Sequence, residues 1–373
     1  MPTIEWVRLE PVHIGDPVST STLLVAFFIE CLFHLSLVMT SQEHSDGAKP
    51  RVLLLGRNHA DQSVMDELER VADVYILPPV EQPAVSAAIG KMVAQHGPFL
   101  AVVILYELIY FPWVFCEEQM GALAPETKLY VLPAAGYDDA DVEWIWSTGA
   151  TFANCPTEVG ERTADGTLLL LLATTRGLTT HFLSTREGRW RDHSIKSLNW
   201  RTKTLGIIGL GSIGIKVAQM ARGLGFRVIY SNRRRSTVTD EFEFVTRQEL
   251  YAQADVVVLM TPLNDETRHM IDKDAITQMR DGVVIVNTSR GPVINEQDLV
   301  DALESGKVLR AGLDVFEKEP EIHPGLKASR NVVITPHVAA RTDDLLVTCT
   351  NESLYNVIEF IKTGSPLTPV LPH

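Results

Sequence analysis

Four polar side chains in the second half of the chain have types and positions that could do chemistry. Arg290, Asp314, Glu319 and His337 stand just beyond short apolar runs typical of buried strands. The carboxyl ends of such strands form the edge at which ligands bind in open α/β sheets. A guanidinium fork matches the geometry of a carboxylate, and an imidazole has its ordinary pKa near working pH. The set therefore indicates a site that binds a small anion and donates a proton. Taken singly, the histidine could be structural and the carboxylates could cap turns.

A glycine motif earlier in the chain has the spacing of a dinucleotide site. Gly209, Gly211 and Gly214 follow the apolar run 205–208 and open a stretch of helical period that reaches about residue 224. In such a motif the first glycine turns the chain, the second lets the backbone approach a pyrophosphate, and the third lets helix meet strand. Ser212 and Ile213 lie between the glycines, so we expect all five residues to contact a cofactor at the helix N-terminus. The alternative is a tight turn without a ligand.

The segment after the next apolar run predicts which nicotinamide cofactor is used. An acidic residue at this point would accept hydrogen bonds from the adenosine ribose of NAD, and none is present. The chain instead reads Ser231-Asn232-Arg233-Arg234-Arg235. Arginine forks match phosphate geometry, so Asn232, Arg233 and Arg234 predict a 2′-phosphate site and a preference for NADP over NAD. A solvated basic loop is the alternative.

The elements that position these side chains fall into two series of βα units. Apolar runs separated by stretches of helical period predict strands on parallel sheets. The runs are 52–55, 74–77, 100–105 and 129–132 in the first series, and 205–208, 228–230, 256–259, 283–286, 311–313 and 332–334 in the second. The six runs of the second series are enough for a complete doubly wound sheet.

Two longer helices are expected outside these series. Residues 163–176 are apolar on nearly every side, as expected of a helix buried between layers or against a second subunit, so we predict a homodimer. Residues 343–363 have helical spacing and are long enough to return to the first domain.

The order and context of these motifs resemble the D-isomer-specific 2-hydroxyacid dehydrogenases, the family of D-lactate and glycerate dehydrogenases and glyoxylate/hydroxypyruvate reductases. The resemblance runs from about residue 51 to the C-terminus. It implies an α/β fold in which a Rossmann dinucleotide-binding domain is inserted in a flavodoxin-like substrate domain. We predict that residues 51–155 and 338–373 form the substrate domain and that residues 156–337 bind NAD(P), with residues 1–50 as an N-terminal extension.

The resemblance also implies roles for the site residues. Arg290 would hold the carboxylate of a 2-oxo acid and polarise its ketone, His337 would donate the proton, and Glu319 would hydrogen-bond the other ring nitrogen. Cofactor contacts are implied for Thr261, Pro262, Thr288 and Asp314. In the first domain, residues 134–138 resemble the family's Gly-x-Gly-Tyr-Asp loop, so we expect Ala135 and Gly136 to bind the substrate carboxylate through main-chain amides.

Two departures from the family pattern concern substrate and rate. Residues 105–120 are unusually apolar and could line the substrate pocket, which leaves the size of the substrate open. Ala339-Ala340-Arg341 replaces the usual small pair after the histidine, with a mild expected effect on catalytic efficiency.

We predict an enzyme that uses NAD(P)H to reduce a small 2-oxo acid, glyoxylate or hydroxypyruvate first, to the D-2-hydroxy acid. Transcriptional corepressors that use this fold as a nucleotide-responsive scaffold are the alternative, because they retain residues equivalent to Arg290, Glu319 and His337. Loss of NADPH absorbance with 2-oxo acids distinguishes the two.

Composition excludes several other classes. The chain has 373 residues, 45% hydrophobic and 21% charged, which is enough apolar material for two or three cores. A net charge of −14 argues against nucleic acid as a partner. The four cysteines are widely spaced without a Cys-x-x-Cys pair, so we expect no metal site and a reducing, cytoplasmic location.

The first fifty residues are treated separately. Residues 22–39 are mostly apolar and just long enough for a membrane span, but Glu30 and His34 weaken that prediction. The preceding segment lacks the basic start of a secretory signal. We expect the fold to begin near residue 50, with residues 1–38 an appendage from a misassigned gene start; a membrane anchor or a packed helix is the alternative.

Overall fold

The computed structural model describes residues 48–81, 84–105, 115–138 and 140–372. The predictions for residues 1–38, and for most of the apolar stretch 105–120, lie outside these residues. Within the part of the chain that is described, no helix has both the length and the apolar character needed to cross a bilayer.

The first sheet has the flavodoxin-like strand order. Its strands run in the order β13-β5-β4-β3-β1-β2, and all neighbouring pairs are parallel except the short pair of β13 with β5. The strands are β1 Arg51–Leu55, β2 Asp73–Leu77, β3 Ala101–Ile104, β4 Leu129–Leu132, β5 Thr151–Asn154 and β13 Pro369–Val370. The sequence predicted the first four of these strands; β5 and β13 were not predicted.

The second sheet is doubly wound, as predicted, and has one additional strand. Its order is β12-β11-β10-β9-β6-β7-β8, with parallel pairing throughout. The strands are β6 Thr204–Ile208, β7 Arg227–Ser231, β8 Glu243–Phe244, β9 Val256–Leu259, β10 Val283–Asn287, β11 Val308–Leu313 and β12 Val332–Ile334. The order reverses at β6 and β9, and this switch point is where an open α/β sheet binds its ligand.

Each sheet is covered on both faces, because alternate side chains of a strand point to opposite sides. In β1, Leu53 packs into one apolar cluster while Val52 and Leu54 pack into another. In β6, Ile207 and Ile208 divide in the same way. The covering helices are α2 Gln62–Val71, α3 Val85–His96, α4 Glu117–Met120, α5 Val142–Ser147, α6 Pro156–Arg176, α7 Leu178–Arg186, α8 Ser212–Gly223, α9 Arg247–Gln253, α10 Lys273–Gln278, α11 Glu296–Glu304, α12 Pro324–Ala328 and α13 Leu345–Thr363.

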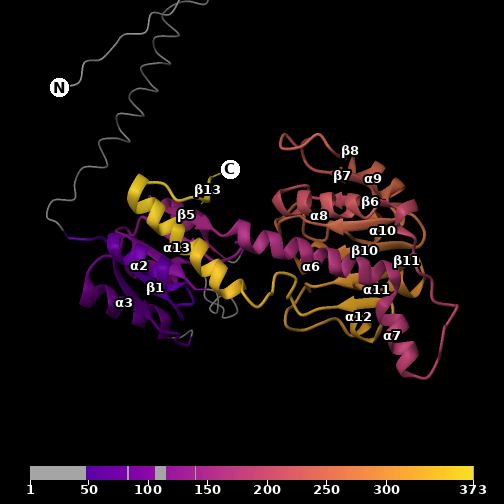
Figure 1. The fold of residues 1–373 in the computed structure, drawn as a ribbon, viewed down its shortest axis with the longest axis horizontal. Coiled ribbons are helices and arrows are strands. Elements are labelled where there is room, and N and C mark those ends of the chain that lie inside the picture. Colours follow the sequence, from indigo (N-terminus) through magenta and orange to yellow (C-terminus); the bar gives the residue numbers. More distant parts are fainter. Residues whose placement is uncertain (1–47, 82–83, 106–114, 139, 373) are drawn as a thin grey trace, which may run out of the picture. The chain divides into compact units, whose positions relative to one another are not determined.

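The last helix returns to the first sheet, as predicted. In Figure 1, α13 lies beside α2, and Leu354, Val357 and Ile358 pack into the cluster that contains β1 residues. Its Glu352 carboxylate also accepts hydrogen bonds from the amides of Thr157 and Glu158, both at 3.1 Å. These are the first amides of α6, which have no partner within their own helix. The contact therefore fixes the start of α6.

The buried face of helix α6 is less apolar than the prediction for residues 163–176 implied. Its buried face includes Thr163, Thr167, Thr174 and Thr175, while Leu169 is 69% exposed. Each of the four threonine hydroxyls donates to the carbonyl four residues earlier, at 2.6 to 2.8 Å. Since a buried hydroxyl is costly only when unpaired, these threonines pack in the interior without an unsatisfied donor.

Candidate active site

His337 and Glu319 form the closest contact among the predicted catalytic residues. His337 follows β12, Glu319 follows β11, and His337 Nδ1 lies 2.8 Å from Glu319 Oε2. The other carboxylate oxygen of Glu319 accepts the amide of Phe316 at 2.9 Å. Because Nδ1 is held by the carboxylate, the ring nitrogen left for a substrate is Nε2.

This contact favours the charged form of both groups. The hydrogen bond that Nδ1 donates to Glu319 raises the pKa of His337 above its ordinary value, outweighing the opposing effects of burial and of the Arg290 charge. Burial by itself would raise the pKa of Glu319, but the hydrogen bond and charge of His337, with the Phe316 amide and Arg290, lower it overall. The pair is therefore an imidazolium and a carboxylate over a wider pH range than either group alone.

Asp314 holds the turn that carries His337. Its carboxylate is 1% exposed and accepts the amides of Val338 and Ala339 at 2.9 and 2.8 Å, while its carbonyl accepts the amide of His337 at 2.7 Å. His337 has a φ of +54°, a conformation that is strained for a residue with a Cβ. Three hydrogen bonds to one residue offset that strain. The nicotinamide contact expected of Asp314 remains a proposal.

Arg290 is held by an acidic residue of the first sheet's loops. Its Nε lies 2.9 and 3.0 Å from the two carboxylate oxygens of Asp138, its Nη2 lies 2.8 Å from Oδ1, and its Nη1 donates to the carbonyl of Ser289 at 2.9 Å. An arginine has five N–H donors. These contacts use one on each nitrogen, so Nη1 and Nη2 each retain one donor for a ligand.

The loop expected to bind the substrate carboxylate lies against Arg290. A Cβ placed on Gly136 would overlap Nη2 of Arg290, so only glycine lets the guanidinium approach this backbone. The carbonyl of Ala135 accepts the Asn154 side-chain amide at 2.8 Å, which fixes the loop. Within the described residues, the amides of Ala135 and Gly136 donate to no protein acceptor. Arg290 and these two amides thus lie close together with donors to spare.

The glycine motif has the shape that a dinucleotide needs. Gly209 has a φ of +101°, and a Cβ on Gly214 would overlap the carbonyl oxygen of Gly209. A Cβ on Gly211 would meet no atom within 4 Å, so the space beside it is open. Ser212 is the first residue of α8, whose first amides have no intrahelical acceptor, and Ile213 packs in the core beneath. The cradle therefore fits a pyrophosphate at a helix N-terminus.

The loop after β9 carries a second feature that fits a cofactor. The Thr261 hydroxyl oxygen is buried and has no hydrogen-bond partner among the described residues. The next residue, Pro262, has its carbonyl bonded to the Thr267 hydroxyl at 2.7 Å. Thr288 is buried after β10, and its hydroxyl lies 2.6 Å from that of Thr167 in α6. An unpaired buried hydroxyl beside the glycine turn is expected where a ligand supplies the missing partner.

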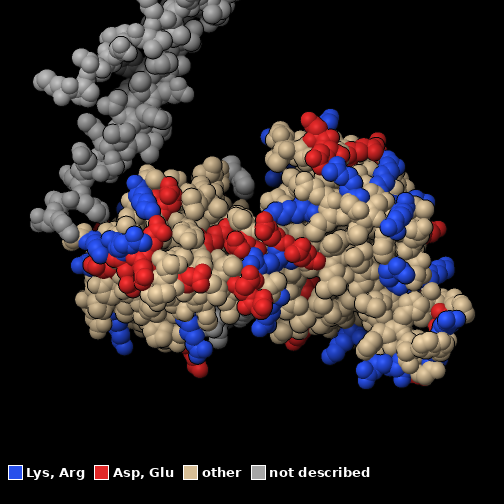
Figure 2. All heavy atoms as spheres, viewed as in Figure 1, with Lys and Arg blue, Asp and Glu red and all other residues tan. Residues whose placement is uncertain are grey.

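The basic segment after β7 divides into an internal and an external part. Asn232 Oδ1 accepts the amide of Leu210 at 2.6 Å and thereby braces the glycine turn. Arg233 and Arg234 are exposed; Arg233 lies 3.8 Å from Glu266, and Arg234 makes no ion pair within the described residues. Figure 2 shows that acidic and basic side chains are interspersed on the face that it draws. Because the chain has a net charge of −14, the adjacent exposed Arg233 and Arg234 are a local cationic group on an acidic chain.

A tightly packed glycine in this cradle yields a prediction with a matched control. Gly214→Ala is expected to raise the Kd for NADPH by about tenfold or more, because its Cβ needs the space of the Gly209 carbonyl. Gly223→Ala, in the same helix with no atom within 4 Å, is expected to leave binding unchanged and the Tm equal or higher. Fluorescence titration with NADPH and thermal melts check both. Equal Kd values for the two variants would show that the cradle is not the cofactor site.

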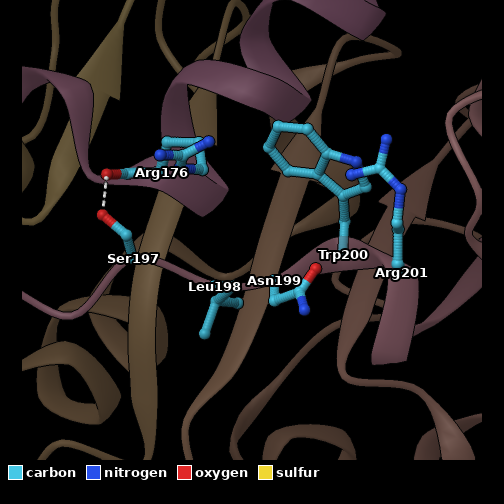
Figure 3. A pocket seen from close by; sticks show the side chains of 6 residues that line it. All are labelled: Arg176, Ser197, Leu198, Asn199, Trp200 and Arg201. Atoms are coloured by element: carbon cyan, nitrogen blue, oxygen red, sulfur yellow. Dashed lines mark hydrogen bonds between the residues drawn. The ribbon is translucent and has the colours of Figure 1, made fainter.

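A hollow elsewhere contains none of the predicted site residues. It measures about 240 Å³ and is lined by Arg176, Ser197, Leu198, Asn199, Trp200 and Arg201. Figure 3 shows the Ser197 hydroxyl bonded to the carbonyl of Arg176, at 2.9 Å, and the Arg176 guanidinium lies 5.2 Å from the ring centroid of Trp200. These contacts join the end of α6 to the segment that enters β6, so we interpret the hollow as structural.

Comparison with known proteins identifies the family. The sequence model of the NAD-binding domain of D-isomer specific 2-hydroxyacid dehydrogenases matches residues 168–339. Glyoxylate reductase 1 of Saccharomyces cerevisiae is 34% identical, and the match covers 86% of this chain and 95% of that protein. The chain belongs to the D-isomer specific 2-hydroxyacid dehydrogenase family.

Two further relatives support membership of this dehydrogenase family. A dehydrogenase of Hormonema carpetanum is 36% identical over 334 residues, covering 86% of this chain and 82% of the relative. The crystal structure of a glyoxylate reductase from Paecilomyes thermophila superimposes with a TM-score of 0.80 at 32% identity, covering 86% and 98% of the two chains. The predicted fold class and the prediction of an NAD(P)-dependent oxidoreductase are confirmed.

Several contacts of this candidate site were not predicted. Asp138 was part of a recognised motif, but its pairing with Arg290 joins residues 152 positions apart. The Thr167 contact with Thr288 spans 121 positions. No periodicity in the sequence indicates contacts between residues so far apart. The motif at residues 134–138 drew attention to Asp138 but not to its pairing with Arg290.

Proposed function

We propose that this dehydrogenase uses NAD(P)H to reduce a small 2-oxo acid to the D-2-hydroxy acid, with glyoxylate and hydroxypyruvate as the first candidates. The observation that carries the proposal is the 2.8 Å contact between His337 Nδ1 and Glu319, beside an arginine that retains free donors. The printed names of the relatives in S. cerevisiae and P. thermophila, both glyoxylate reductases, support this substrate class.

The side chains divide the work of the reaction. NAD(P)H, when bound, supplies the hydride. Arg290 binds the substrate carboxylate and polarises the carbonyl through its two remaining N–H groups, and the amides of Ala135 and Gly136 add donors to the carboxylate. His337 donates its Nε2 proton to the carbonyl oxygen as negative charge develops there. Glu319 keeps the ring charged and oriented while Asp314 fixes its turn. Oxidation of the hydroxy acid uses the same groups in reverse.

Arg233 and Arg234 support NADP as the preferred cofactor. Both are exposed just after the end of β7, where the ribose of a bound dinucleotide lies in this fold. The chain has no acidic residue at this position to accept hydrogen bonds from the ribose hydroxyls. A guanidinium pairs with a 2′-phosphate through charge-assisted hydrogen bonds. We therefore propose NADP over NAD, with contacts from Thr261, Pro262, Thr288 and Asp314 at the nicotinamide end.

A homodimer is proposed from exposed apolar side chains on α6, on α7 and on the segment after it. Leu169, Leu178, Phe182 and Trp190 are 69, 58, 55 and 79% exposed. Large apolar side chains exposed on consecutive segments of the chain favour an interface with a second copy.

The three cysteines among the described residues are free, which supports a reducing, cytoplasmic location. We also propose the domain division at residues 155/156 and 337/338.

The proposed function is tested by mixing purified protein with NADPH and a panel of 2-oxo acids. The panel runs from glyoxylate and hydroxypyruvate to branched and aromatic 2-oxo acids, with loss of NADPH absorbance as the signal. We expect turnover that is fastest with the small acids, and kcat/KM higher with NADPH than with NADH. Cofactor binding without turnover of any acid would contradict the enzyme and support a nucleotide-responsive scaffold. A higher kcat/KM with NADH would refute the cofactor preference alone.

A further inference from the structure

The loop that carries Glu319 is fastened two residues earlier by a reciprocal pair of glutamates. The amide of Glu317 donates to Glu296 Oε1 at 2.9 Å, and the amide of Glu296 donates to Glu317 Oε1 at 3.0 Å. Glu296 is the first residue of α11 and is 8% exposed. The Glu317 carboxylate therefore accepts a hydrogen bond from a helix N-terminal amide that has no acceptor within α11. This contact ties the Glu317 loop to the start of α11.

A histidine from a third segment completes the cluster. His269 Nε2 lies 3.1 Å from Glu317 Oε1. His269 has a φ of +50°, and its amide donates to the carbonyl of Pro292 at 2.7 Å. It therefore touches both the Glu317 loop and the turn that begins at Arg290.

The two segments joined by this cluster also pack directly on each other. A Cβ on Gly291 would overlap the carbonyl carbon of Phe316, so the backbone next to Arg290 touches the backbone next to Glu317. At the far end of the same loop, Glu319 accepts the Phe316 amide and contacts His337. A shift of Glu317 would therefore be transmitted to Glu319 over two residues, and to Arg290 through Gly291.

The cluster brings the carboxyl groups of Glu296 and Glu317 close together. Burial raises the pKa of Glu296, the Glu317 amide opposes that effect, and the charge of Glu317 adds to it, with a smaller contribution from Glu319. Carboxylates so close repel one another when ionised. The charge of His323 opposes this rise in the pKa of Glu296, and His269 Nε2 contacts Glu317. The cluster therefore holds two carboxyl groups side by side where the Glu317 loop meets α11.

We propose that Glu317, held between Glu296 and His269, is a positioning residue that keeps Glu319 against Nδ1 of His337. The positioning role itself does not require turnover, but the change in kcat expected from it rests on the proposed function. Glu317 touches no reacting atom; it acts through the loop to Glu319, and the imidazolium that Glu319 favours is the species that donates the proton.

The test compares Glu317→Ala with Glu317→Gln and with Glu321→Gln as a matched control. Glutamine retains an oxygen that can accept the Glu296 amide, so it is expected to restore most of what alanine loses. Glu321 is exposed on the same loop, and its side chain makes no hydrogen bond or ion pair with a described residue. For Glu317→Ala we expect kcat to fall about tenfold, with the KM for NADPH unchanged, since small misplacements of catalytic groups cost rate. The basic limb of kcat/KM is expected to move to lower pH.

A second measurement does not depend on turnover. NMR titration of the His337 ring in the unliganded protein should give a lower pKa in Glu317→Ala than in the wild type, with Glu321→Gln unchanged. If Glu317→Ala does not fold, His269→Asn takes its place, because asparagine tolerates a positive φ. A His337 pKa equal to that of the wild type in the folded variant would overturn the positioning role. Absence of turnover by the wild type would instead refute the proposed function and leave the titration valid.

Discussion

His337→Ala is expected to lower kcat/KM for 2-oxo acid reduction by about 10² to 10⁴, the range typical of a positioned general acid. The hydride can still reach the carbonyl carbon, but the oxygen must then take its proton from water. Binding of NADPH is expected to be unchanged, because the glycine cradle lies in a different loop. Decay of NADPH absorbance gives the rate, and fluorescence titration gives the Kd.

His337→Asn separates chemistry from backbone strain. The histidine has a φ of +54°, which asparagine adopts more readily than alanine. Both variants should lose activity equally if the imidazole is the proton donor. Activity within threefold of the wild type in His337→Asn would mean that the residue serves only the turn.

Arg290→Lys is expected to lower kcat/KM by about 10² to 10³, although the charge is retained. A lysine ammonium cannot span Asp138 while presenting two further donors to a substrate, because it lacks the planar fork. Steady-state kinetics with glyoxylate should show both a higher KM and a lower kcat.

The control for this change is Arg227→Lys. Arg227 is an exposed arginine at the start of β7, 2.8 Å from Glu243, and its replacement should leave the kinetics unchanged. Unaltered kinetics in Arg290→Lys as well would remove Arg290 from substrate binding. A loss confined to kcat would assign it to polarising the carbonyl alone.

The parts of the fold that were predictable are those with a local chemical reason. The strands of the second sheet are runs of buried Val, Ile and Leu, and the turn at Gly209 needs a positive φ. Strands β8 and β13 escaped prediction because each has two residues, too few for any period. Strand β5 was missed although its four residues lie in the sheet interior.

The site was predictable in its residue types but not in its supporting contacts. Arg290, Glu319 and His337 each follow a strand, and strand ends meet at one edge of a sheet. The groups that hold them follow from the folded chain alone: Asp138 on Arg290, and Glu296 on the Glu317 loop. Asn232 is predicted to contact the cofactor, which stays a prediction, and its side chain also braces Leu210, a contact that no spacing indicates.

The pH dependence of reduction, measured for the wild type and for Glu319→Gln, tests the central claim most directly. The proton donor must be charged, so activity falls as pH rises through the pKa of His337, which Glu319 holds above its ordinary value. The wild type should therefore keep full kcat/KM to a higher pH, and Glu319→Gln should lose activity at a lower one, with a reduced plateau. Superimposable pH profiles for the two proteins would contradict proton donation by a carboxylate-held imidazolium.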